Sequence, residues 1–145
     1  MKPKRAYLYI FLVIFFILDS NNIIFKDLPA QNNDVVVIIN KTRGKLSKIQ
    51  IKRIFTGRIT RWPNGGGDIK ILLNKDPKIA KRFCKKYLNL KPHELDDIWV
   101  KRSIRTGIPR PRKVNSVVIT TMVANSDVFI GVVSKAETNT SIKQL

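Results

Sequence analysis

The stretch Leu46–Gly66, which reads LSKIQIKRIFTGRITRWPNGG, carries the strongest local signals of the fold. Ser47 and Gln50 have the spacing of a capping box, in which each side chain accepts a hydrogen bond from the other residue's backbone N–H. Leu46 and Ile51 stand at the two positions of a hydrophobic staple, so the sequence specifies this helix start twice. The apolar face of the predicted helix is Ile51, Ile54 and Phe55.

The second half of this stretch is expected to leave the helix and turn. Gly57 can adopt the left-handed conformation that ends a helix. Residues 62–67 read WPNGGG, and a glycine run of this kind can surround a phosphate group. This one lacks the Lys-Ser/Thr pair of a P-loop and leads to a strand, so we interpret it as a turn held by a half-buried Trp62.

Three short apolar segments predict a sheet around this helix. Val35–Ile39 (VVVII) is β-branched, too short for a helix and typical of a strand buried on both faces, as in the centre of a parallel sheet. Ile69–Leu73 and Val128–Val133 are the other two strands, and Gly131 lies inside the last one. Because strands alternate with helices, the expected fold class is α/β, with a small, mostly parallel sheet flanked by helices.

A second helix is expected directly after Ile69–Leu73. Asp76 and Pro77 supply an N-cap and a first-turn proline. Apolar residues then recur at steps of three and four, at Ile79, Ala80, Phe83, Cys84, Tyr87 and Leu88. Cys84 is the only cysteine, and its place on this apolar face predicts a buried thiol that packs as a small hydrophobe rather than a nucleophile.

A third helix is expected to begin at Pro92, and its first turn holds the residues that could suggest catalysis. His93 is the only histidine, and no second His or Cys is near it in the sequence, so we expect no metal site and no cofactor. Asp96 and Asp97 adjoin Glu94 on the same solvated turn, and the sequence has no Ser-His-Asp order. We therefore expect that the protein is not an enzyme.

Prolines shape the region that follows. Pro109 and Pro111 stand two residues apart, so Arg105–Lys113 is expected to be a loop without regular structure. Asn115 or Ser116 then caps a final apolar helix.

The first residues have the layout of a secretory signal peptide. Lys2, Lys4 and Arg5 precede Ala6–Leu18, a run of thirteen uncharged and mostly apolar residues. Because a membrane-spanning helix needs about 20 apolar residues, we predict a signal peptide at residues 1–20, cleaved after Ser20, and keep a retained anchor as the alternative. Export predicts a periplasmic or secreted protein with no stable membrane span after cleavage.

Length and composition limit the architecture. The chain has 145 residues, of which 43% are hydrophobic, and 28 Lys+Arg against 10 Asp+Glu give a net charge of +18. This apolar content is typical of a folded domain and excludes a disordered basic tail. A complete two-lobed binder needs roughly 200–300 residues. We therefore assign residues 21–34 to a leader, residues 35–135 to one domain and residues 136–145 to a frayed polar tail.

Together these segments resemble a known family. The resemblance runs from Val35 to Val133, and its most specific part is the ordered pattern Leu46-Ser47, Ile51, Ile54-Phe55, Gly57, Trp62 and Asn64-Gly65. VVVIIN at Val35–Asn40 and FIGVV at Phe129–Val133 support it. In these motifs the chain resembles the phosphate-type periplasmic substrate-binding proteins of ABC transporters, and its length is similar to that of short, single-lobe relatives.

The resemblance implies one lobe of the type II periplasmic binding protein fold. In full-length members it implies capture of an oxyanion between two lobes, by an Arg and a Ser-Gly-Thr turn at the start of the helix that carries Phe83 here. In this chain residues 74–79 read NKDPKI, where Pro77 removes a backbone donor and Asp76 adds a negative charge. The residues that we expect to contact an inorganic oxyanion are Asn74, Lys75, Lys78, Thr106, Gly107 and Ser116.

The positive charge gathers on one helix face and one loop. Because lysines and arginines three and four residues apart repel one another, folding does not require this arrangement. The expected anionic-surface patch consists of Lys78, Lys81, Arg82, Lys85, Lys86, Arg105, Arg110, Arg112 and Lys113. Specific nucleic-acid binding is not expected, because the sequence has no aromatic stacking strip and no reading motif.

The sequence leaves two functions open. The first is an exported, non-catalytic, single-lobe relative of phosphate-binding proteins that binds an oxyanion weakly or binds a second protein chain. The alternative is a basic adhesion module for anionic surface polymers such as lipopolysaccharide. A third interpretation is that the lysines only keep the surface soluble.

Overall fold

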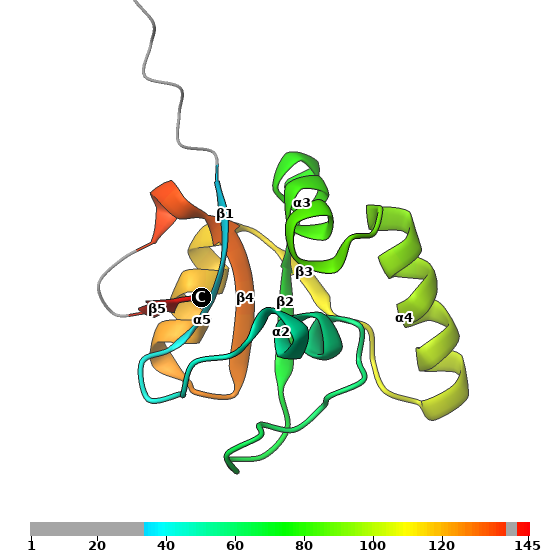
Figure 1. Cartoon of the computed structure of the whole chain (residues 1–145), viewed down its shortest axis with the longest axis horizontal. Coiled ribbons are helices and arrows are strands. Elements are labelled where there is room, and N and C mark those ends of the chain that lie inside the picture. Colours follow the sequence, from blue (N-terminus) through cyan, green and yellow to red (C-terminus); the bar gives the residue numbers. More distant parts are fainter. Residues whose placement is uncertain (1–33, 139–141) are drawn as a thin grey trace, which may run out of the picture. The chain divides into compact units, whose positions relative to one another are not determined.

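The computed structural model describes residues 34–138 and 142–145 (Figure 1). The predicted signal peptide and the leader as far as residue 33 lie outside the described residues. The elements are β1 (Val35–Asn40), α2 (Lys48–Phe55), β2 (Lys70–Asn74), α3 (Pro77–Phe83), the π-helical turn η2 (Cys84–Leu88), α4 (Pro92–Thr106), β3 (Arg112–Val114), α5 (Ser116–Asn125), β4 (Phe129–Ser134), the 3-10 turn η3 (Lys135–Glu137) and β5 (Ile142–Gln144). None of the described helices is long and apolar enough to cross a membrane.

The strands form one mixed sheet in the order β3-β2-β4-β1-β5. Strand β2 runs parallel to β3 and β4, whereas β1 runs antiparallel to both of its neighbours, β4 and β5. The α/β class and the small, helix-flanked sheet are confirmed, but the expectation of a mostly parallel sheet with β1 as a parallel strand was wrong. A continuous apolar run reports burial on both faces, and it does not encode the direction of the neighbouring strands.

Helices cover both faces of this sheet, as Figure 1 shows. Val35, Val37 and Ile39 of β1 pack into a core with α2, α3, η2 and α4. Val36 and Ile38 point to the opposite face and pack against Ile119 and Val123 of α5, together with other apolar residues. Because successive side chains of a strand point to opposite faces, a five-residue apolar run is needed to fill both layers.

The signals in Leu46–Gly66 act as the sequence predicts. The Ser47 Oγ accepts a hydrogen bond from the Gln50 backbone N–H at 3.2 Å, and the Gln50 side chain accepts one from the Ser47 N–H at 2.8 Å. Ile51, Ile54 and Phe55 are buried. Gly57 has a φ of 74°, and a Cβ at this position would collide with the Arg102 side chain.

The WPNGGG segment forms turns, and Arg43 holds it in addition to Trp62. The guanidinium of Arg43 lies 4.8 Å from the centre of the Trp62 ring and donates hydrogen bonds to the carbonyls of Gly65 at 2.7 Å and Gly66 at 3.1 Å. Trp62 is 5% exposed, so it is buried more deeply than expected. Arg43 therefore ties this turn to the segment that follows β1.

The helix after β2 begins as predicted and buries Cys84. Ile79, Phe83 and Cys84 are all buried within the core that contains α2. Removal of Cys84 from water raises the pKa of its thiol to about 11, because burial disfavours the thiolate. The interpretation of Cys84 as a packing residue is thus supported by its position.

Two segments that were expected to lack regular structure contain helix or strand residues. Helix α4 continues to Thr106, and Arg112–Val114 pairs with β2 as strand β3, so only residues 107–111 of the expected Arg105–Lys113 loop lie outside these elements. The tail expected to be frayed contains β5, which pairs with β1 and buries Ile142. Both strands are three residues long, so their own sequences carry little signal, and pairing with an apolar strand stabilises them.

Gly131 of β4 allows α5 to approach the sheet. A Cβ at Gly131 would overlap the Cγ2 of Ile119 on α5. We therefore predict that Gly131→Ala lowers the free energy of unfolding by about 1–3 kcal/mol, the usual cost of overpacking. Urea denaturation of the single variants and of the double variant Gly131→Ala/Ile119→Ala checks the mechanism. The double variant should lose less than the sum of the two single losses, and strict additivity would contradict the proposed overlap.

Candidate functional site

The end of β2 is the position where the family resemblance implies an anion site. Asn74, the last residue of β2, is 4% exposed. Its Nδ2 donates to the Ser116 Oγ at 2.7 Å and to the Val132 carbonyl at 3.2 Å, and its Oδ1 accepts from the Asp76 N–H at 3.0 Å. The amide of Asn74 is therefore engaged with the protein itself.

The start of α3 carries its own negative charge. The Asp76 carboxylate accepts a hydrogen bond from the Lys78 backbone N–H at 2.7 Å, as an N-cap does. Pro77 follows at the first helical position and has no N–H to donate. An anion at this helix start would have to displace or approach the Asp76 carboxylate.

The structure brings together only part of the predicted ligand-binding set. The Asn74 and Ser116 side chains are hydrogen-bonded to each other. Lys75 and Lys78, which follow Asn74 in the sequence, are exposed. Thr106 and Gly107 end α4, before β3 begins. Since β3 is parallel to β2, and Asn74 pairs with Val114 at the end of β3, Thr106 and Gly107 belong to the opposite end of these strands.

The predicted anionic-surface patch falls on separate elements. Its members on α3 and η2 are Lys78, Lys81, Arg82, Lys85 and Lys86, all exposed. Lys86 forms an ion pair with Asp34 at 2.8 Å, and this hydrogen bond is the largest cause that lowers the pKa of the Asp34 carboxyl. Arg105 lies in the last turn of α4, while Arg110 precedes β3 and the residues Arg112 and Lys113 belong to it.

A groove with a volume of about 540 Å³ lies between α4 and the β3 segment. Its lining residues are Leu73, Asp96, Trp99, Arg110, Pro111, Arg112 and Lys113. We call it the α4–β3 groove. Its three cations, Arg110, Arg112 and Lys113, belong to the predicted anionic-surface patch. The sequence did not predict a groove here, because Arg105–Lys113 was expected to be a loop and its position beside α4 depends on the fold.

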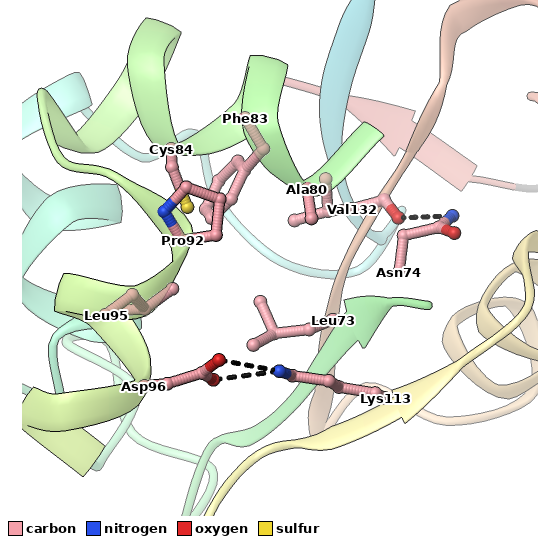
Figure 2. Close-up of a pocket in the computed structure, with 10 residues that line it drawn as sticks. All are labelled: Leu73, Asn74, Ala80, Phe83, Cys84, Pro92, Leu95, Asp96, Lys113 and Val132. Carbon is pink, nitrogen blue, oxygen red and sulfur yellow. Dashed lines mark hydrogen bonds and ion pairs between the residues drawn. The ribbon is translucent and has the colours of Figure 1, made fainter. Parts of the chain in front are cut away.

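A second, much smaller cavity adjoins the groove (Figure 2). Its volume is about 30 Å³, and its walls are mostly apolar, with Phe83, Cys84 and Leu95 among them. The carboxylate of Asp96 and the Nζ of Lys113 form an ion pair at 2.9 Å. Leu73, Asp96 and Lys113 line both spaces, so this ion pair lies at the boundary between them.

Two of the acidic residues that could suggest catalysis are bound to other parts of the chain. Glu94 accepts a hydrogen bond from the Lys91 N–H at 2.6 Å at the start of α4, and Asp96 pairs with Lys113. His93 is exposed in the same turn. Among residues 34–138 and 142–145, no three His, Cys, Asp or Glu side chains come together in a way that could hold a metal ion.

The capping role of Asp76 can be measured. Asp76→Ala should lower the free energy of unfolding by about 1 kcal/mol, because the Lys78 N–H loses its acceptor. Asp76→Asn should change it by only a few tenths of a kcal/mol, because asparagine caps as well as aspartate. Urea denaturation of both variants distinguishes the cap from the charge. Equal losses in the two variants would show that the carboxylate charge, rather than the cap, stabilises this helix start.

Comparison with known proteins bears on the fold. No protein-family model and no curated protein significantly matches the sequence. Among solved structures, one described as a phosphate ABC transporter substrate-binding protein from Clostridium perfringens, with bound phosphate, matches with a TM-score of 0.57 and 22% identity, over 77% of this chain and 43% of that one. An ABC-type phosphate transport receptor from Vibrio cholerae matches with a TM-score of 0.48 and 17% identity, over 77% of this chain and 44% of that one.

The chain thus spans less than half the length of the solved proteins that it matches. The expected similarity of fold to a substrate-binding protein is confirmed by the Clostridium perfringens structure. This chain is similar in fold to part of a phosphate ABC transporter substrate-binding protein.

Proposed function

We propose that the chain is an exported, non-catalytic binding module that has the fold of one substrate-binding lobe and binds anionic polymers through its exposed cations. The observation that carries this proposal is the outer face of α3 and η2. Within the described residues, the side chains of Lys78, Lys81 and Lys85 are exposed and have no ion-pair or hydrogen-bond partner. Neighbouring like charges destabilise a helix slightly, and an anionic partner outside the chain would offset this repulsion.

The polar groups at the end of β2 already bond one another, which favours binding through exposed cations over capture of phosphate at this position. The Asn74 amide bonds Ser116, Val132 and Asp76, and the Asp76 carboxylate caps α3. The second form of the proposal is weak oxyanion binding by the exposed side chains of Lys75 and Lys78, without the backbone N–H groups at the start of α3.

The proposed export and the proposed lack of catalysis have separate supports. Export rests on the basic residues and the apolar run that precede Ser20. The non-catalytic role is supported by the engagement of Glu94 and Asp96 in a helix cap and an ion pair, and by the buried, high-pKa thiol of Cys84. An exported module with this surface would encounter anionic envelope polymers such as lipopolysaccharide.

Binding to immobilised heparin tests the proposed function. We predict that the full chain remains bound above about 0.5 M salt, because release of many counterions makes multivalent binding strong at moderate salt. The triple variant Lys78→Gln/Lys81→Gln/Lys85→Gln should elute at clearly lower salt. The matched control Lys45→Gln/Lys48→Gln/Lys52→Gln removes the same charge elsewhere and should elute closer to the unmodified chain. Elution of the unmodified chain near physiological salt, or equal shifts in both variants, would argue for a merely solubilising surface.

A further inference from the structure

We propose that the free edge of β3 binds an extended acidic segment of another protein, which adds a strand to the sheet beside Arg112–Val114. Strand β3 lies at one end of the strand order, and within the described residues it pairs with β2 alone. The edge of a sheet carries backbone N–H and C=O groups that can pair with a further chain. This inference goes beyond the proposed function, because the occupant is a peptide backbone and the site does not lie on α3 or η2.

The backbone of Lys113 provides the hydrogen-bonding groups of this edge. The Lys75 N–H donates to the Val114 carbonyl at 3.0 Å, so the backbone polar groups of Val114 face β2. Because these groups alternate between the two sides of a strand, those of Arg112 also face β2 and those of Lys113 face outward. Among the described residues, the N–H and C=O of Lys113 and the C=O of Pro111 have no hydrogen-bond partner. The edge therefore offers a donor and two acceptors to an added strand.

Space for an added strand lies beside this edge. The α4–β3 groove, of about 540 Å³, lies between β3 and α4. The Lys113 side chain projects to the α4 side, where its Nζ pairs with the Asp96 carboxylate at 2.9 Å (Figure 2). An added residue opposite Lys113 projects to the same side, because directly paired side chains share a face of the sheet. Leu73 and Trp99 also line this side, so that position of the added strand suits an apolar side chain.

The opposite side of the edge is positively charged. Arg112 pairs with Leu72, which packs on the α5 side of the sheet, so the Arg112 side chain projects to that side. Pro111 favours an extended conformation of Arg110, whose side chain then projects to the same side as that of Arg112. Both arginines are exposed, and among the described residues neither side chain has an ion-pair or hydrogen-bond partner. Acidic side chains at alternate positions of the added strand would complement these two charges.

The same two charges select the occupant. If the β3 edges of two copies paired, the arginines of both copies would come together, and like charges on neighbouring strands destabilise pairing. An acidic strand gains opposite-charge pairs instead. The partner is therefore a segment of a different protein, in which acidic side chains alternate with apolar ones.

Nuclear magnetic resonance titration of the ¹⁵N-labelled full chain with the peptide Glu-Val-Glu-Val-Glu, acetylated and amidated at its ends, tests the proposal. We expect saturable shifts centred on Arg112–Val114. Hydrogen exchange of the Lys113 amide should become slower, because this N–H gains an acceptor. The same peptide with every backbone nitrogen methylated keeps its charge and loses its donors. It should bind at least about threefold more weakly, because hydrogen bonds to the edge carbonyls are lost.

Two variants that each lose two positive charges make the test specific. Arg110→Gln/Arg112→Gln should weaken peptide binding at least about threefold, because two exposed ion pairs are lost. Lys81→Gln/Lys85→Gln removes two charges from α3 and η2 and should leave the affinity nearly unchanged. The amide spectrum of each variant reports that the fold is retained.

Four results would each overturn the proposal. These are the absence of saturable shifts, equal losses in both variants, equally tight binding of the methylated peptide, and unchanged exchange of the Lys113 amide at saturation. Equal binding of the methylated peptide would show attraction of charge alone, without strand addition.

Discussion

The buried amide of Asn74 is the interaction on which this end of the molecule depends. A buried side-chain amide must find hydrogen-bond partners, because leaving it unpaired costs about 1–3 kcal/mol. Asn74 finds them on three other parts of the chain: Val132 in β4, Ser116 at the start of α5 and the Asp76 N–H at the start of α3. One side chain thus fixes how a strand ends and how two helices begin.

This arrangement also decides what the β2 end can bind. The same contacts that order the segment engage the Asn74 amide, and Asp76 adds a carboxylate at the position where an anion would approach α3. The fold is similar to part of a phosphate ABC transporter substrate-binding protein. At this position, however, the polar groups bond one another, and the Asp76 carboxylate would repel an anion. Part of the unpaired positive charge of the described residues lies on the outer face of α3 and η2, at Lys78, Lys81 and Lys85. For this reason we place the proposed function on exposed surfaces.

Local signals in the sequence predicted where the helices begin. The sequence did not predict features that depend on distant parts of the chain, such as strand direction. Ser47 with Gln50, and Asp76 with Pro77, act through neighbours a few residues away, so the sequence alone identified both helix starts. Strand direction depends on partners far along the chain, which is why the antiparallel pairing of β1 was missed. The three-residue strands β3 and β5 form only because β2 and β1 offer edges to pair with. The groove was missed for the same reason, since α4 and β3 meet only in the folded chain.

The most direct test of the account is a phosphate titration followed by the backbone amides of Asp76, Lys78 and Ile79. Asp76 already accepts the Lys78 N–H hydrogen bond. We therefore predict that these amides show no saturable shift at millimolar inorganic phosphate. A saturable shift centred on the Lys78 amide would mean that phosphate binds at the start of α3 in spite of the Asp76 carboxylate, and it would contradict the account.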